Sequence, residues 1–201
     1  MQGRLISKQM SSGNVETEVK IRLADPDELR ERLGQHGFTQ RAARQFESNS
    51  LYDTPQHELR RNGALLRLRQ FGERSVITWK GRGEARPFKT RPELETGVDS
   101  LDTARQILER LGYVRTFRYE KFRTEYVEAG NPEGGVLTFD ETPIGTFLEL
   151  EGSGEWIDRK ASQLGFSKED YILSSYGTLY LEECKRRGVE PADMVFASHS
   201  Q

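Results

Sequence analysis

The stretch VETEVKIRL, residues 15–23, decides the fold because its side chains alternate strictly in character. Apolar residues and one threonine occupy the odd positions, and the even positions carry two acids and two bases: Glu16, Glu18, Lys20 and Arg22. Successive side chains of a β-strand point to opposite faces of the sheet, so this strand has one apolar face and one fully charged face. A strand that only faces water usually mixes its charges with neutral polar residues. The charged face therefore calls for an explanation other than exposure to water.

The same alternation recurs in later stretches of the chain. Their charged positions, each opposed by apolar neighbours, are Arg67, Arg69, Lys80, Lys89, Arg91, Glu93, Glu95, Lys121, Arg123, Glu125, Asp140, Glu149 and Glu151. For any one strand, an ordinary antiparallel sheet with one face in water is the simpler interpretation. The series as a whole favours a closed barrel that is lined with charge and covered outside by helices.

Helical signals fall between the strand-like stretches. Proline at the first turn, leucines four apart and a terminal glycine predict a short helix over residues 26–37. Similar signals predict a turn of helix over residues 55–63, a helix over residues 101–112, and helices in the last part of the chain. We therefore expect an α+β fold, a closed eight-stranded antiparallel barrel with helices packed outside, as one domain over residues 15–187. Residues 1–14 and 188–201 are expected to be flexible termini.

Composition excludes several classes of protein. The chain of 201 residues is 31% charged but has a net charge of only −2, which argues against a basic nucleic-acid-binding surface. No apolar run approaches the roughly 18–20 residues of a membrane span. The single cysteine, Cys184, has no internal partner for a disulfide, which fits a reducing compartment. We expect a cytoplasmic protein without nucleic-acid or membrane partners; a homodimer is left open.

A cavity lined with both signs of charge calls for a highly charged ligand. Burying these groups is costly unless they are paired or bind ions. Rows of Arg and Lys suit an oligophosphate, and neighbouring carboxylates suit Mg²⁺ or Mn²⁺, which bridge to phosphate oxygens. The pattern therefore indicates a metal–triphosphate complex.

The sequence at residues 16–20, ETEVK, resembles the ExExK signature of the CYTH superfamily, the triphosphate tunnel metalloenzymes. This family includes class IV adenylyl cyclases, thiamine triphosphatases and inorganic triphosphatases. Further stretches follow in the family's order: LYDT, GALLRLR, TWKG, RPELE, EKFR, LTFDETPIGTFLELEG and SSYGTLY, which together extend the resemblance over residues 15–185.

The resemblance implies an eight-stranded barrel whose tunnel binds a small-molecule triphosphate with a divalent metal, Mg²⁺ or Mn²⁺. It assigns the metal-binding acids to Glu16, Glu18, Asp140, Glu149 and Glu151. It assigns the triphosphate-binding residues to Arg67, Arg69, Lys80, Lys121 and Arg123. Arg91, Glu93 and Glu95 are expected in the same tunnel. Lys20 is the expected catalytic lysine and Tyr52 its tyrosine partner. Tyr176 is a further candidate for substrate contact.

Three functions fit this reading. The first is a metal-dependent hydrolase of tripolyphosphate, thiamine triphosphate or a nucleoside triphosphate, in which Lys20 beside Tyr52 orients a water, or deprotonates it if the lysine pKa is depressed. The second is a class IV adenylyl cyclase that converts ATP to cyclic AMP and pyrophosphate. The third is a non-catalytic binder of phosphorylated ligands, which has no evident need for five carboxylates. The expected pairing of Lys20 with Tyr52 favours hydrolysis.

Overall fold

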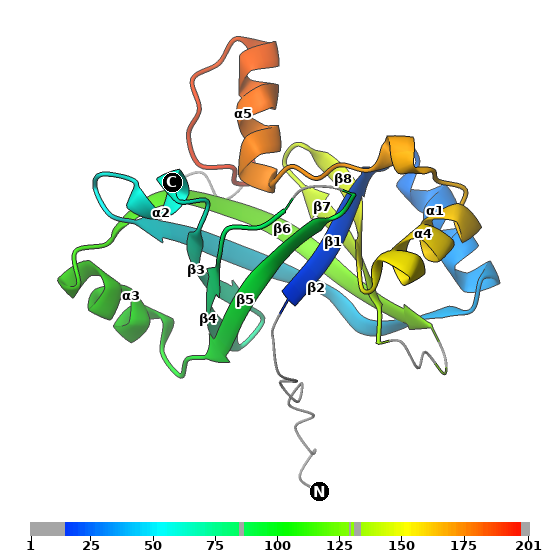
Figure 1. Cartoon of the computed structure of the whole chain (residues 1–201), viewed down its shortest axis with the longest axis horizontal. Coiled ribbons are helices and arrows are strands. Elements are labelled where there is room, and N and C mark those ends of the chain that lie inside the picture. Colours follow the sequence, from blue (N-terminus) through cyan, green and yellow to red (C-terminus); the bar gives the residue numbers. More distant parts are fainter. Residues whose placement is uncertain (1–14, 85–86, 129, 131–133, 198–201) are drawn as a thin grey trace, which may run out of the picture.

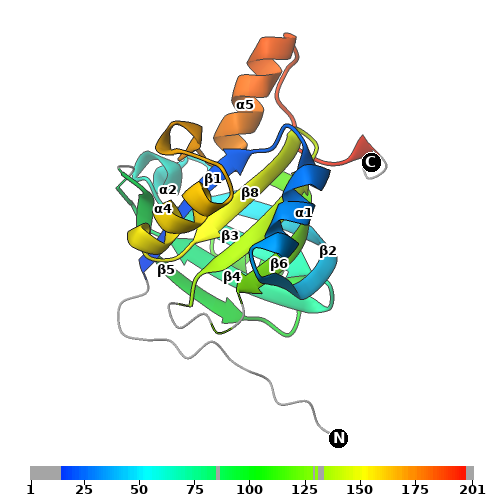
Figure 2. The same ribbon diagram turned by 90° about the vertical axis from the view of Figure 1, so that its right-hand side faces the viewer.

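Eight antiparallel strands close into a barrel in the computed structural model, which describes residues 15–84, 87–128, 130 and 134–197 (Figures 1 and 2). The strands are β1 (Val15–Arg22), β2 (Phe38–Asp53), β3 (Leu65–Phe71), β4 (Arg74–Lys80), β5 (Lys89–Gly97), β6 (Val114–Glu128), β7 (Val136–Thr142) and β8 (Gly145–Glu151). They are hydrogen-bonded in the order β1-β5-β4-β3-β2-β6-β7-β8, and β8 returns to β1. The predicted fold is confirmed. The expected flexibility of residues 1–14 falls outside the described residues.

The strand β1 closes the barrel because it pairs on both sides. Glu16 lies opposite Arg91 of β5, and Lys20 lies opposite Glu149 of β8. Both pairs join unlike charges on the inner face, where cross-strand neighbours of opposite sign are favourable. The charged face of β1 is therefore matched by its two neighbours.

The apolar faces of the strands point outward and form the core with the helices. Helices α1 (Pro26–Gln35) and α4 (Gly154–Gln163) cover β1, β7 and β8, where Val19, Leu148 and Trp156 are fully buried. Helix α3 (Leu101–Arg110) covers the opposite end of the barrel, as Figure 1 shows. The short α2 (Glu58–Arg61) and a 3₁₀ turn, Lys168–Asp170, complete the connections. The charged side chains of the strands therefore point into the barrel interior.

Helix α5 (Tyr176–Arg187) projects away from the barrel with its first turn on the barrel rim (Figures 1 and 2). The Ser175 side chain caps this turn by accepting the Thr178 N–H at 3.2 Å. At the other end, Gly188 adopts a left-handed conformation, φ +68°, and stops the helix. These two signals fix where Tyr176 enters the barrel.

The segment after Gly188 differs from the expectation of a flexible terminus. Met194 is 1% exposed and packs among Tyr119, Phe147 and Tyr176. Its N–H donates to the Arg118 carbonyl and its carbonyl accepts from the Glu120 N–H, both at 2.9 Å, along the edge of β6. Residues 193–196 are therefore part of the folded body. Among the described residues, no helix combines the length and apolar character needed to cross a membrane.

Candidate active site in the barrel interior

The barrel encloses a cavity of about 1470 Å³ that runs from Leu65 at one end of β3 to Phe71 at the other. Eleven of the predicted site residues line it: Glu16, Glu18, Lys20, Arg67, Arg69, Lys80, Arg91, Lys121, Arg123, Glu149 and Glu151. The structure also places Lys89, Glu93, Glu95 and Tyr176 on the same wall. Alternation along the strands therefore brings charges from six strands to one cavity.

A pair of cations on β6 is held by one buried carboxylate. Asp140 of β7 is 0% exposed and lies behind the cavity wall. It accepts from Lys121 Nζ at 2.7 Å and from Arg123 Nε at 2.7 Å. The Tyr176 hydroxyl donates to the same carboxylate at 2.8 Å. Asp140 thus fixes the direction of two cations that face the cavity, and its oxygens are already occupied.

The arginines of β3 are fixed by neighbouring strands. Arg67 donates to the Tyr119 hydroxyl and to Thr78 Oγ1, both at 3.3 Å. Arg69 donates to Glu95 of β5 at 3.0 Å. The Nε atoms of both arginines are buried without a hydrogen-bond partner in the described part of the chain. Each guanidinium therefore has one N–H donor that no described residue satisfies.

Lys20 lies between two carboxylates. Its Nζ is 3.1 Å from Glu18 and 3.0 Å from Glu149, and 5.3 Å from the centre of the Tyr176 ring. Burial disfavours the ammonium, but Glu149 and Glu18 outweigh that effect and raise the pKa of Lys20 above its usual value. With both carboxylates beside it Lys20 is therefore a cation, which favours a role in orienting water over one in deprotonating it.

Tyr52 is not the partner of Lys20. It is 3% exposed and packs outside the barrel with Leu68, Ala104 and Leu108, beneath α3. The odd positions of β2, such as Leu51, face the cavity, so Tyr52 at an even position faces away. The expected catalytic role of Tyr52 is contradicted, and Tyr176 is the tyrosine next to Lys20.

The carboxylates of the tunnel are engaged by cations. Lys80 Nζ lies 2.5 Å from Glu16, and Lys89 Nζ lies 2.5 Å from Glu18. Burial raises the pKa of Glu18, but Lys20 and Lys89 outweigh it, so the pKa lies well below its usual range. Arg123 donates to both Asp140 and Glu149. Glu18 is therefore charged and able to accept a cation.

The acids fit a hard divalent cation by donor chemistry and by register. Glu18 of β1 lies directly opposite Glu151 of β8, with Glu149 two residues from Glu151 on the same face. Like charges in opposite positions destabilise a sheet unless a cation lies between them. Carboxylate oxygens are the preferred ligands of Mg²⁺ and Mn²⁺. In the described residues no three such side chains already converge on one point, so an ion would replace lysine contacts.

Three polar residues of the interior were not assigned a role from the sequence. Glu47 is 1% exposed and Asn49 is fully buried, both on the inner face of β2. The amide oxygen and nitrogen of Asn49 have no hydrogen-bond partner among the described residues. Lys89 of β5 completes the set. The alternation in QFESNSL, residues 45–51, was the available signal for the β2 pair.

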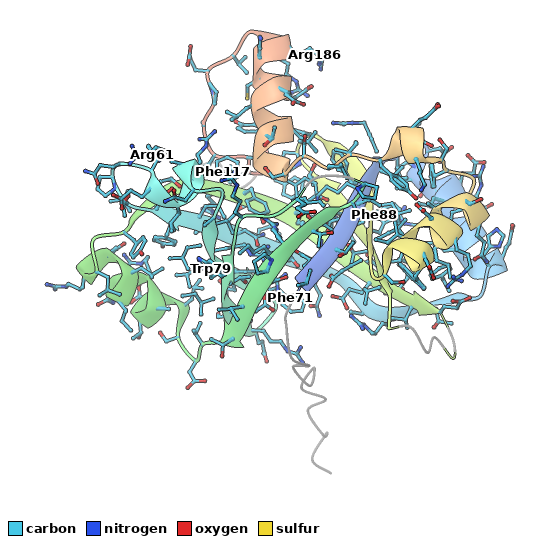
Figure 3. All side chains as sticks on the ribbon, in the orientation of Figure 1. Arg61, Phe71, Trp79, Phe88, Phe117 and Arg186 are labelled. Atoms are coloured by element: carbon cyan, nitrogen blue, oxygen red, sulfur yellow. The ribbon has the colours of Figure 1, made fainter. Side chains whose placement is uncertain are left out.

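One mouth of the cavity has an apolar wall. Leu51, Leu65 and Tyr119 line it together with Gly177 in the first turn of α5. Phe117 stacks on Tyr119 with ring centres 6.0 Å apart and lies 3.6 Å from the position of a Cβ at Gly177. Figure 3 labels Phe117 near α5 and Phe71 toward the other end of the barrel. This mouth can hold an uncharged group attached to a phosphate chain.

The chain belongs to the CYTH family: residues 14–176 match the model of the CYTH domain. Adenylate cyclase CyaB of Aeromonas hydrophila is 29% identical over 182 residues, 87% of this chain and 93% of that protein. Protein MJ0240 of Methanocaldococcus jannaschii is 27% identical over 173 residues, 81% of this chain and 96% of the relative.

Solved structures with the same fold extend this similarity. The PH1819 protein of Pyrococcus horikoshii matches with a TM-score of 0.70 at 24% identity, covering 84% of this chain and 99% of that one. HpAC1 of Hippeastrum, whose structure is described as revealing a dominant triphosphatase activity, matches with a TM-score of 0.57 at 21% identity, over 88% and 97% of the two chains.

Proposed function

We propose that this protein is a divalent-metal-dependent hydrolase that acts on a triphosphate inside the barrel. The observation that carries the proposal is the facing arrangement of the cavity wall. Arg67, Arg69, Lys121 and Arg123 present a row of cations, and Glu16, Glu18 and Glu149 face the same space. Phosphoryl transfer depends on positioning and charge stabilisation more than on covalent chemistry, and this wall supplies both.

The acids Glu16, Glu18, Glu149 and Glu151 would hold the metal ion, Mg²⁺ or Mn²⁺. Bound there, the ion adds positive charge at the phosphate oxygens. Asp140 is the less suitable ligand of the predicted set, because its oxygens already accept from Lys121, Arg123 and Tyr176. Its role in the proposal is to hold the cations in place.

Lys20 acts as a fixed positive charge next to the reacting phosphate. Its position between Glu18 and Glu149 keeps it protonated, so it donates hydrogen bonds and stabilises developing negative charge. Tyr176 stabilises this region because its hydroxyl donates to Asp140 and its ring lies beside the Lys20 ammonium.

An adenylyl cyclase is the second candidate, favoured by the apolar mouth. A wall made of Leu51, Leu65 and Tyr119 suits a nucleobase better than inorganic phosphate. The similarity to a protein named adenylate cyclase, CyaB, points the same way. The loss of the Lys20–Tyr52 pairing removes one argument for hydrolysis over cyclisation. A non-catalytic binder of phosphorylated ligands would need the cations of the tunnel but not its acids, so it is the less favoured function.

A product assay separates these functions. The purified protein is incubated with tripolyphosphate, thiamine triphosphate or ATP, with Mg²⁺ and then Mn²⁺, and phosphate, pyrophosphate and cyclic AMP are resolved. We expect phosphate release that is lost in Glu16→Ala and Lys20→Ala but kept in Glu125→Gln, whose carboxylate pairs with Arg41 at the rim. Cyclic AMP with equal pyrophosphate would establish the cyclase instead. Tight binding without any product would leave a binding protein.

A further inference from the structure

Glu47 lies beneath the cations of the tunnel, and neither the predicted metal site nor the predicted phosphate site uses it. It is on the inner face of β2, opposite Lys121 of β6 and Phe71 of β3. Only 1% of its surface is exposed. A carboxylate buried to this degree is costly unless cations surround it.

Three cations surround Glu47 at more than hydrogen-bond length. The nearest nitrogen–oxygen distances are 3.5 Å to Lys121, 3.8 Å to Arg69 and 3.9 Å to Arg123. Its Oε2 has no hydrogen-bond partner in the part of the chain that the structure describes. Asp140, in contrast, contacts Lys121 and Arg123 at 2.7 Å or less. Asp140 is a clamp for these two cations, whereas Glu47 supplies negative charge without directing them.

Glu47 is charged under all ordinary conditions. Burial raises its pKa, but Lys121, Arg123 and Arg69 outweigh that effect and lower the pKa to about 2. Its negative charge is therefore present whether or not a ligand is bound. Any phosphate that binds Lys121, Arg69 and Arg123 shares them with this resident carboxylate.

We propose that Glu47 is a built-in counter-ion of the phosphate site, which balances Lys121, Arg69 and Arg123 in the empty tunnel and weakens their hold on the phosphate product. It acts through the negative charge that it places beside these cations and not by contact with the phosphate. The inference rests on the proposed function in one respect, namely that the cations bind phosphate. Its consequence is specific: removing the charge of Glu47 tightens anion binding, whereas removing a merely structural contact would weaken it.

The test compares Glu47→Gln with Glu47→Asp and with Glu125→Gln. Glu125 also lines the cavity, but it pairs with Arg41 rather than with the three cations. Binding of pyrophosphate and tripolyphosphate is measured by calorimetry without metal. We expect Glu47→Gln to bind pyrophosphate about tenfold more tightly, because one negative charge is lost close to the site. Glu47→Asp restores the wild-type affinity in large part, and Glu125→Gln changes it little.

Two further readouts keep the proposal falsifiable. In turnover assays, Glu47→Gln should lower KM and kcat together and be inhibited more strongly by pyrophosphate, because release becomes slow. If the variant is unstable alone, pyrophosphate should raise its Tm more than that of the wild type. Wild-type or weaker binding by Glu47→Gln would overturn the counter-ion role and leave the proposed function standing. A wild-type protein that binds neither anion would overturn both.

Discussion

Lys89 shows how one residue of the tunnel responds to its neighbours. Burial and the nearby charge of Lys20 lower its pKa to about 8, although Glu18 opposes the change. Lys20, only one barrel strand away, has its pKa moved in the opposite direction because two carboxylates flank it. Two lysines in one cavity therefore differ in whether they keep their proton at alkaline pH.

The first prediction concerns pH. Above about pH 8 Lys89 loses its charge, so the tunnel holds tripolyphosphate less tightly. The Kd measured without metal should rise about tenfold, relative to that of Lys89→Arg, between pH 7.5 and pH 9.5. Comparison with the arginine variant cancels the titration of the ligand. The pKa of Lys89 is lower in the folded protein than in the unfolded chain, so below about pH 8 the charged lysine lowers the free energy of unfolding. This cost disappears as the pH rises from the folded-state pKa toward the unfolded-state pKa. Parallel curves for the two proteins would contradict the prediction.

The second prediction concerns Tyr52, whose side chain lies outside the tunnel under α3. Tyr52→Phe should keep kcat within about twofold of wild type, because its hydroxyl is remote from Lys20. Tyr52→Ala should instead lower the free energy of unfolding by about 3 kcal/mol through the cavity that it leaves. Steady-state kinetics and denaturant unfolding check the two expectations. A kcat loss of ten times or more in Tyr52→Phe would restore the original hypothesis.

At the scale of elements, α5 controls the apolar mouth. A Cβ at Gly177 would lie 3.6 Å from Phe117, which is an ordinary contact, so a larger residue fits the backbone and narrows the opening. Gly177→Leu should reduce kcat/KM for ATP and thiamine triphosphate by about tenfold and leave tripolyphosphate nearly unchanged. Ala42→Leu, in the cavity wall on β2, is the matched control. Equal losses for all three substrates would show that no organic group enters there.

The C-terminal segment stabilises the same mouth from outside. Met194 is buried against Tyr119 and Tyr176, which both line the cavity. Met194→Ala should lower the free energy of unfolding by about 3 kcal/mol, since a buried methionine leaves a cavity. Val189→Ala, at a position that is 53% exposed, should change it by less than about 0.5 kcal/mol. Chemical denaturation distinguishes them, and equal stabilities would mean that this segment does not contribute.

For the molecule as a whole, the metal is expected to serve chemistry and not folding. The apolar core lies outside the barrel, between strands and helices, and contains residues such as Val19, Leu148 and Ile157. The tunnel acids are already paired with cations. EDTA should therefore abolish turnover and leave Tm within about 2 °C, and excess Mg²⁺ or Mn²⁺ should restore activity. A large fall in Tm on chelation would assign the ion a structural role.

Alternation along the strands was sufficient to predict the barrel and most of its lining. On β1 the charged residues Glu16, Glu18 and Lys20 all face inward. The charged residues of β3 and β8 likewise fall on one parity, so a period of two identifies the tunnel face. Tyr52 was assigned from resemblance, against the parity of its own strand. Glu47 and Asn49 follow that parity, but register shifts between Gln40 and Gln45 interrupt the pattern on β2.

Burial of the C-terminal segment had no local signal. Residues 189–197 contain neither strand nor helix periodicity, and Met194 is held by backbone bonds to β6, some 75 positions earlier in the chain. Such a contact depends on the completed fold. The state of Lys20 was equally inaccessible, because its pKa follows from Glu149, which reaches it only after β8 pairs with β1.

The position of β1 between β5 and β8 has a consequence for biosynthesis. The strand with the ExExK motif leaves the ribosome first, yet one neighbour is complete only at Gly97 and the other at Glu151. Before Gly97 is translated neither edge of β1 has a partner in the barrel, and one edge stays unpaired until β8 is complete. A nascent chain that stalls before β8 is translated has an open sheet and lacks the tunnel acids Glu149 and Glu151, and such unpaired edges invite association between chains. In this fold the barrel closes only when β8, the last strand to be translated, pairs with β1, the first.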